Sequence, residues 1–153
     1  MDDAALLNLA ADLARQAGAT ILAVRARGFE AHAKPDASPV TEADHAAEAL
    51  IAAGLRRVTP DIPVIAEEEL AAGHVPARAA TFWVVDPLDG TKEFAAMRDD
   101  FAVNIGLVRN GRVVLGAVAV PAHGELFGGI LGHGAWKRTA AGEQRISARP
   151  PPA

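Results

Sequence analysis

The chain has 153 residues, of which 50% are hydrophobic, and it carries a formal net charge of −4. This length suffices for one domain with a buried core, and the apolar content excludes a disordered chain. The acidic balance argues against a protein that coats nucleic acid, and the absence of cysteine excludes disulfide bonds and thiolate metal sites.

The N-terminal part predicts one long helix, from about Asp3 to Ala26. Asp2 or Asp3 is its expected N-cap, and Gly28 is expected to end it. Apolar residues recur along it at steps of three and four, as on the buried face of a helix: Leu6, Leu9, Leu13, Ala17, Ile21 and Val24. The following residues 30–40 are polar and include two prolines, which predicts a loop or a short irregular strand.

A second helix is predicted to begin after Thr41, because Thr41-Glu42-Ala43-Asp44 has the form of a capping box. Pro60 would stop this helix. Its buried face would carry Ala47, Leu50, Ile51 and Leu55. Asp44 has two interpretations at this stage. It is either a first-turn acid that favours the helix dipole, or an acid that supports a hydroxyl group in catalysis.

The next segment is a short strand, residues 63–66, followed by three acids, Glu67-Glu68-Glu69. Consecutive acids behind a strand most often form a solvated loop. In the alternative interpretation, one of them points toward the acids that follow the next strand. That next strand, Phe82–Val85, leads into the most informative segment of the chain.

The segment Asp86-Pro87-Leu88-Asp89-Gly90-Thr91-Lys92-Glu93-Phe94 follows this buried strand directly. Pro87 has no N–H to donate and keeps the preceding residue out of helical geometry, so that the Asp86 side chain projects from the strand end. Each acid alone would indicate a turn or a helix cap. Together, two carboxylates, a glycine and a threonine can hold a hard cation and offer backbone N–H groups to an anion.

After Phe94 the pattern changes to an antiparallel meander, with strands predicted at residues 101–108, 112–120, 125–131 and 135–137. The predicted turns are Asn110-Gly111, His123-Gly124 and Gly132-His133-Gly134. The proline-rich tail from Arg145 to Ala153 is an expected exit segment. We therefore predict an α+β fold in which two long helices pack on a mainly antiparallel sheet, with residues 1–147 as one domain and 148–153 as the exit.

The candidate chemistry depends on Glu67, Asp86 and Asp89, which lie at or just beyond the ends of two strands. If those strands are neighbours, the three carboxylates converge, and their repulsion is tolerable only around bound cations. An all-oxygen ligand set favours Mg²⁺, and the five histidines show no zinc-binding spacing. A pair of such ions can activate a water molecule and stabilise a leaving alkoxide.

Thr91 would position or help to deprotonate that water if Asp44 supports its hydroxyl group. The N–H groups of Gly90 and Thr91 would hold a phosphate oxygen if a helix starts there. The chemistry predicted from the residues is metal-assisted hydrolysis of a phosphate ester. In the structural alternative, the acids serve only as caps and turns.

The run Trp83–Phe94 resembles the signature of the inositol monophosphatase superfamily, which comprises Mg²⁺-dependent, lithium-sensitive phosphatases. Three other stretches agree in order and spacing: residues 39–44, 63–68 and 101–105. Lys92-Glu93 resembles the residues at these positions in the CysQ-type branch, the 3'(2'),5'-bisphosphate nucleotidases. These enzymes convert 3'-phosphoadenosine 5'-phosphate to AMP and are linked to sulfate assimilation. Inositol-phosphate phosphatases, which typically have Thr-Thr-Asn-Phe here, are the alternative.

The resemblance implies a role for each candidate residue. The implied metal ligands are Glu67, Asp86, Asp89 and the carbonyl of Leu88. The implied catalytic pair is Asp44 and Thr91, and the implied phosphate contacts are Gly90, Thr91 and Glu67, with Glu68 behind the ligands. The complete family site holds two or three Mg²⁺ ions. The implied partner is a small phosphorylated molecule and not a nucleic acid polymer.

The resemblance also implies the N-terminal half of a layered α/β sugar-phosphatase fold. The family's second half carries a Trp-Asp-x-Ala-Ala-Gly type segment whose aspartate binds metal, and no aspartate follows Phe101 here. We therefore expect a truncated product or a fragment, with one metal ligand fewer and impaired activity. A non-catalytic remnant that still binds Mg²⁺ is the alternative.

A cytoplasmic protein without a transmembrane segment is expected. The acidic start Met1-Asp2-Asp3 is unlike a secretory signal, and the apolar runs end before the roughly 18 residues of a membrane span. Peripheral association with the inner membrane, known for some family members, stays open, although no basic amphipathic stretch requires it. A homodimer also stays open.

Overall fold

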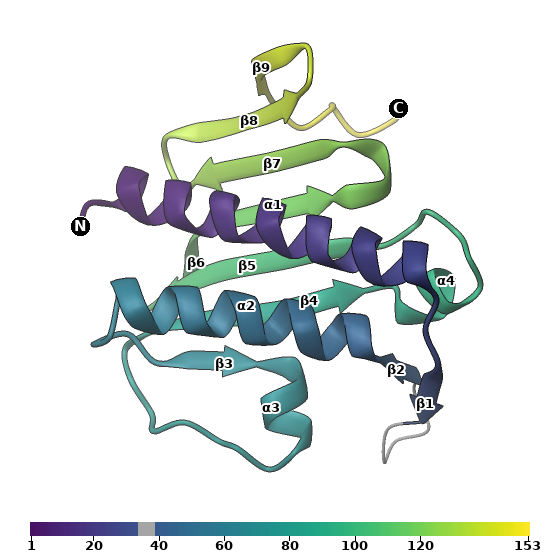
Figure 1. Ribbon diagram of the computed structural model, residues 1–153. Helices are drawn as coiled ribbons and strands as arrows, with labels where there is room; N and C mark the ends of the chain where they lie inside the picture. The colour runs from purple at the N-terminus through teal and green to yellow at the C-terminus, as the bar shows by residue number, and fades with distance from the viewer. Residues whose placement is uncertain (34–38) are drawn as a thin grey trace.

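The computed structural model describes residues 1–33 and 39–153, with side chains described outside residues 31–40. Two long helices, α1 (Asp3–Arg27) and α2 (Glu42–Val58), lie side by side on one face of a seven-stranded sheet (Figure 1). A small sheet of β1 (Ala31–Ala33) and β2 (Pro39–Thr41) lies between them in the chain. Most of the expected loop, residues 34–38, lies outside the described residues. The predicted α+β fold class is confirmed.

The large sheet follows chain order, so each strand pairs with its neighbours in sequence. Its strands are β3 (Val64–Ala66), β4 (Thr81–Asp89), β5 (Ala102–Arg109), β6 (Arg112–Val120), β7 (Glu125–Ile130), β8 (Gly134–Thr139) and β9 (Gly142–Ile146). Among the described strands of this sheet, β3 and β4 pair in parallel, and all other pairs are antiparallel. The predicted meander is therefore confirmed.

Local backbone chemistry accounts for several element ends. Asp2 caps α1 by accepting a hydrogen bond from the Ala5 N–H at 2.8 Å, and Gly28 ends the helix at a φ of 86°. Asn110 and Gly111 adopt positive φ values of 51° and 75° in the hairpin between β5 and β6. These three predictions are confirmed.

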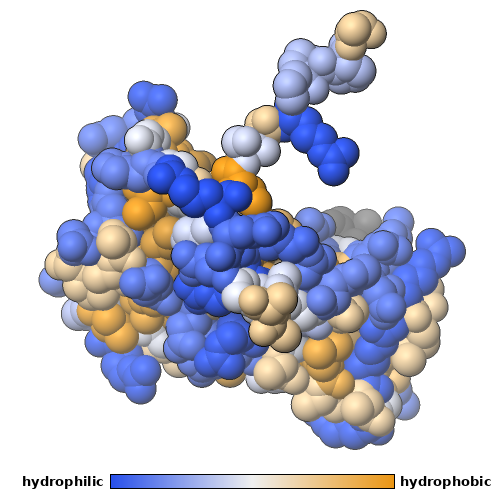
Figure 2. Space-filling view, turned by 90° about the horizontal axis from the view of Figure 1, so that it is seen from above, coloured by the Kyte–Doolittle hydropathy of each residue, from blue (hydrophilic) through white to orange (hydrophobic). Residues whose placement is uncertain are grey.

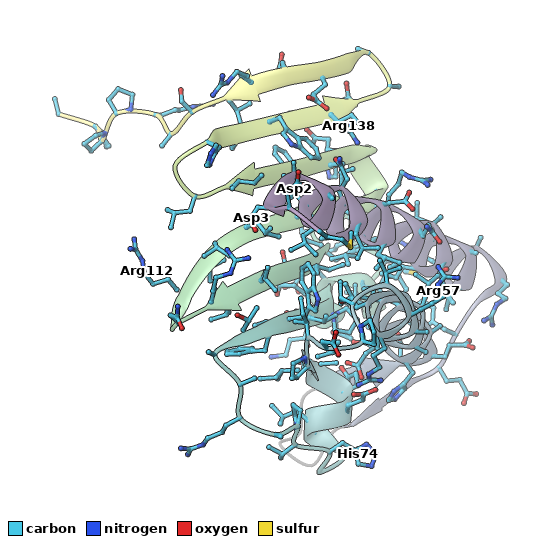
Figure 3. The ribbon with its side chains drawn as sticks, turned by 90° about the vertical axis from the view of Figure 1, so that its left-hand side faces the viewer. Asp2, Asp3, Arg57, His74, Arg112 and Arg138 are labelled. Carbon is cyan, nitrogen blue, oxygen red and sulfur yellow. The ribbon has the colours of Figure 1, made fainter. Side chains whose placement is uncertain are left out.

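The core fills the space between the helix layer and the sheet. The apolar stripe of α1 contributes Leu6, Leu13, Ala17, Ile21 and Val24 to it. Trp83 on β4 is fully buried, and its indole N–H donates to Thr59 Oγ1 at 3.0 Å. The two helices approach closely because Gly54 lacks the Cβ that would collide with Leu13. Figure 3, in which α2 is seen nearly end on, shows side chains filling this layer, while exposed Arg57 lies on the outer side of α2.

Two sequence-based predictions are wrong. The acids Glu67-Glu68-Glu69 begin a short helix, α3 (Glu67–Ala71), where a solvated loop was expected. The segment at Arg145 belongs to β9, where an exit tail was expected. β9 is a mostly exposed edge strand, so it lacks the apolar alternation by which strands are predicted, and it is held by pairing with β8 and by the Arg138–Glu143 ion pair.

Strand β4 also continues beyond its predicted end. Pairing with β5 is regular to Asp86, shifts register, and resumes where Asp89 pairs with Ala102. This irregularity surrounds Pro87, which cannot donate a ladder hydrogen bond. The strand therefore carries both aspartates of the informative segment, and α4 (Thr91–Ala95) follows at once.

The chain after β9 leaves the sheet (Figure 1), and in Figure 2 it projects from the body of the molecule. Residues 147–153 form no helix or strand. Within residues 1–33 and 39–153, no helix combines the length and the hydropathy that a membrane span requires.

Candidate active site

Two neighbouring strands bring two acids together. β3 and β4 pair in parallel with Ala66 opposite Val85, so the next residues, Glu67 and Asp86, lie side by side where β3 ends. Their carboxyl groups are hydrogen-bonded to each other. The condition for convergence of these two acids, neighbouring strands, is therefore met.

The pKa of Asp86 is shifted strongly by its surroundings. Burial is the largest cause, and the adjacent carboxyl groups of Glu67 and Asp89 add to it; together they raise the pKa of Asp86 to about 7. The backbone N–H of Leu88 opposes this shift by hydrogen bonding to the charged form. One carboxyl oxygen, Asp86 Oδ1, is buried with no hydrogen-bond partner among the described residues. A buried oxygen without a hydrogen-bond partner, close to other carboxylates, is the kind of atom that binds a cation.

Asp89 lies further from this pair. It is exposed, and its Oδ2 is 3.5 Å from the Asn104 amide nitrogen of β5. Across the described residues, no three His, Asp or Glu side chains are grouped closely enough to hold a metal ion. The structure thus brings Glu67 and Asp86 together, whereas Asp89 acts on Asp86 through its charge. The oxygen-only donors, including the orphaned Asp86 Oδ1, nevertheless fit the preference of Mg²⁺.

The second half of the site is built on the N-terminus of α2. Asp44 is fully buried, and its Oδ2 accepts hydrogen bonds from Thr41 N at 2.9 Å and Thr41 Oγ1 at 2.8 Å. Its other oxygen, Oδ1, lies 3.0 Å from the Thr91 hydroxyl. Asp44 therefore fits both interpretations of its role, because it caps its helix and contacts the threonine.

The Thr91 hydroxyl is oriented by two acceptors, Asp44 Oδ1 and the Leu88 carbonyl at 3.1 Å. A hydroxyl has one proton to donate, so it serves one acceptor at a time or shares the proton between them. The hydroxyl oxygen also has two lone pairs, with which it can accept a hydrogen bond from a water molecule. The geometry suits a group that orients or deprotonates a nucleophilic water.

Gly90 links the two aspartates to α4. It adopts a left-handed φ of 91°, and a Cβ at this position would lie 2.5 Å from the Asp100 carbonyl oxygen. Phe94 of α4 is fully buried, where it stacks on Phe29 at 4.7 Å and meets Phe101 edge to face at 5.2 Å. These contacts hold the turn that presents Thr91.

We expect Gly90→Ala to destabilise the protein by about 2–4 kcal/mol, because it adds a backbone clash to the strain of a positive φ. Gly111→Ala is the matched control, since Gly111 also has a positive φ of 75° but open space around it. Urea denaturation of both variants checks this. Equal losses of unfolding free energy would contradict the role of the close approach to Asp100.

An open cavity of about 540 Å³ lies beside the candidate site. Asp89, Gly90 and Glu93 line it on the side of β4 and α4, and Arg98 and His123 add cationic or protonatable groups. A cavity of this size, lined by both polar and apolar groups, has room for a phosphorylated small molecule.

Sequence reasoning missed one residue at this end of the sheet, Glu48. It is 4% exposed, and its carboxylate accepts hydrogen bonds from the backbone N–H groups of Glu68 at 2.6 Å and Glu69 at 2.8 Å. Burial is the main cause that raises its pKa. The available signal was an acid four residues after Asp44, on the same helix face and between the buried Ala47 and Ile51.

The chain matches the inositol monophosphatase family over residues 2–152 and belongs to that family. It is 43% identical over 151 residues to the 3'(2'),5'-bisphosphate nucleotidase CysQ of Salmonella typhimurium, covering 95% of this chain and 61% of that protein. A histidinol-phosphatase of Streptomyces coelicolor is 38% identical over 140 residues, covering 89% of this chain and 50% of that protein.

Solved structures agree with this assignment. The crystal structure of CysQ from Bacteroides thetaiotaomicron superposes with a TM-score of 0.72 at 33% identity, covering 95% of this chain and 60% of that one. The chain thus spans about 61% of the length of the first of these relatives. The resemblance stated from the segment Trp83–Phe94 and its companion stretches is confirmed at the level of the family and of its CysQ-type members.

Proposed function

We propose that this chain supplies the metal- and phosphate-binding part of a Mg²⁺-dependent phosphoric monoester hydrolase. The proposed reaction is that of a 3'(2'),5'-bisphosphate nucleotidase, which releases phosphate from 3'-phosphoadenosine 5'-phosphate to leave AMP. The observation that carries the proposal is the Thr91 hydroxyl held 3.0 Å from buried Asp44 near the paired acids Glu67 and Asp86. Residues 1–147 would form this domain.

Glu67, Asp86, Asp89 and the Leu88 carbonyl would hold the metal. When bound, Mg²⁺ would neutralise the carboxylates and polarise the phosphate group. As the Thr91 oxygen takes a proton from the attacking water, the hydroxyl would pass its own proton to Asp44 Oδ1, which lies 3.0 Å away and also orients it. The N–H groups of Gly90 and Thr91 would bind a phosphate oxygen. Glu67 would belong to the phosphate-binding site as well as to the metal ligands. Glu68 would contact the metal ligands without binding the metal itself.

The substrate assignment is supported by the nucleotidase relatives and by the Lys92-Glu93 pair. Arg98 in the neighbouring cavity offers positive charge to a second phosphate group, and His123 lines the same cavity. Inositol-phosphate hydrolysis is the alternative enzymatic activity. The non-enzymatic alternative is a remnant that binds Mg²⁺ but does not hydrolyse a substrate. A cytoplasmic location and a homodimer stay predictions.

The test is phosphate release by the 153-residue chain with Mg²⁺ and, in separate reactions, 3'-phosphoadenosine 5'-phosphate, inositol 1-phosphate and histidinol phosphate. We expect release from the bisphosphate nucleotide, abolished by Asp86→Asn. Preference for either other substrate would overturn the substrate assignment. A folded chain that binds Mg²⁺ but releases no phosphate from any of them would support the remnant.

A further inference from the structure

One face of α2 reaches both halves of the candidate site. Asp44 and Glu48 are four residues apart, so their side chains leave the helix on the same side, and both are buried. Asp44 holds the Thr91 hydroxyl, and Glu48 holds two backbone N–H groups at the start of α3. Those two groups belong to Glu68 and Glu69, directly after Glu67.

Helix α3 depends on this contact for its first turn. The residue before it, Ala66, provides no side-chain hydrogen bond to the free N–H groups that every helix start exposes. A serine, threonine or aspartate at that position would cap the helix locally. Here the acceptors come from a different helix, at a sequence separation of 20 residues for Glu68 and 21 for Glu69.

This arrangement has an energetic cost that a simple cap avoids. Glu48 is buried, and the side chains of Glu68 and Glu69 carry charges of the same sign nearby. A carboxylate makes a shorter and stronger hydrogen bond to a backbone N–H than a neutral acceptor does, and the two bonds together fix the start of α3. Because Glu67 is the first residue of α3 and follows β3 directly, its backbone has little freedom left.

We propose that Glu48 is a positioning residue, which acts through the α3 backbone to place the Glu67 carboxylate beside Asp86 for Mg²⁺ binding. The same rigid helix face then sets both the metal ligand Glu67, through Glu48, and the water-orienting Thr91, through Asp44. This inference rests on the proposed function, since it assigns a role within that metal site.

The test compares the wild-type chain with Glu48→Gln, which preserves shape but points an NH₂ donor at one of the two N–H groups. In the metal-free protein, amide exchange at Glu68 and Glu69 should become at least about 10-fold faster. Mg²⁺ affinity, measured by calorimetry, should fall about 10- to 100-fold, as for other residues that orient metal ligands. If Glu48→Gln does not fold, the same two measurements are made on Glu48→Asp, which keeps the negative charge but has a shorter side chain.

Thr59→Val is the matched control, because the buried Thr59 hydroxyl that it removes bonds to Trp83 and to the Leu55 carbonyl, both outside α3. It should lower stability but leave both Mg²⁺ affinity and exchange at Glu68 and Glu69 unchanged. Mg²⁺ affinity of Glu48→Gln equal to that of wild type would overturn the positioning role while leaving the metal site intact. A wild-type chain that binds no Mg²⁺ would overturn the proposed function and this inference together.

Discussion

Asp86→Asn will make the metal-free protein more stable at pH 8 and abolish its stabilisation by Mg²⁺. The substitution removes a carboxylate that burial and two acidic neighbours disfavour, and its amide can donate a hydrogen bond to Glu67. We expect a gain of about 1–2 kcal/mol in unfolding free energy, a figure reduced for solvent screening of a partly exposed group. Thermal denaturation with and without Mg²⁺ measures both effects.

The pH dependence of this variant follows from the same shift. Folding raises the pKa of Asp86 from 3.8 to about 7, so the folded state binds the proton more tightly than the unfolded state. The resulting stabilisation is complete below about pH 4 and is lost as the pH rises through about 7. Metal-free wild type should therefore lose stability across this range relative to Asp86→Asn.

Asp61→Asn provides the control, because it removes one exposed aspartate charge outside the site. It should change neither the response to Mg²⁺ nor the slope of stability against pH between 4 and 7. If Asp86→Asn still gained stability from Mg²⁺ as wild type does, the metal-ligand assignment of Asp86 would be wrong. In that case the acids would serve as caps and turns.

Thr91→Val will lower the rate of phosphate release by about 10²- to 10⁴-fold, the range typical for removal of a group that handles a proton in the transition state. Valine has nearly the shape of threonine but lacks the hydroxyl that lies 3.0 Å from Asp44 Oδ1. Stability should fall by about 1–3 kcal/mol, since the buried Asp44 oxygen loses a partner. Steady-state kinetics at saturating Mg²⁺ and urea denaturation separate the two effects.

Thr91→Ser keeps the hydroxyl and tests whether that group, rather than the side-chain volume, is responsible. Its rate should stay within about 10-fold of wild type, because only a methyl group is lost. A valine variant as active as the serine variant would exclude Thr91 from the handling of the water. The Asp44–Thr91 contact would then be part of the helix cap alone.

Much of the fold follows from local chemistry that can be read along the chain. The cap at Asp2, the capping box of Thr41 and Asp44, and the Asn110-Gly111 turn each depend on residues within a few positions of one another. The family signature from Trp83 to Phe94 is recognisable for the same reason. Its residues lie in one continuous segment that forms a strand end, a turn and the start of a helix.

The metal side of the site was less predictable. The sequence indicated that Glu67 and Asp86 would converge if their strands were neighbours, and parallel pairing of β3 with β4 meets that condition. It did not indicate that Asp89 would be exposed beside Asn104, since this depends on the register shift between β4 and β5.

The family, the helix caps, the hairpin turn and the residue types of a phosphate- and cation-binding site could all be predicted from the amino-acid sequence. Three features became visible only in the folded chain: the three consecutive acids begin α3, β9 forms the edge of the sheet, and Glu48 accepts from the Glu68 and Glu69 amides. The difference lies in the sequence separation between the interacting residues. Caps and turns are satisfied by neighbours in the chain, whereas a buried carboxylate finds its donors on another element, and no local pattern records that contact.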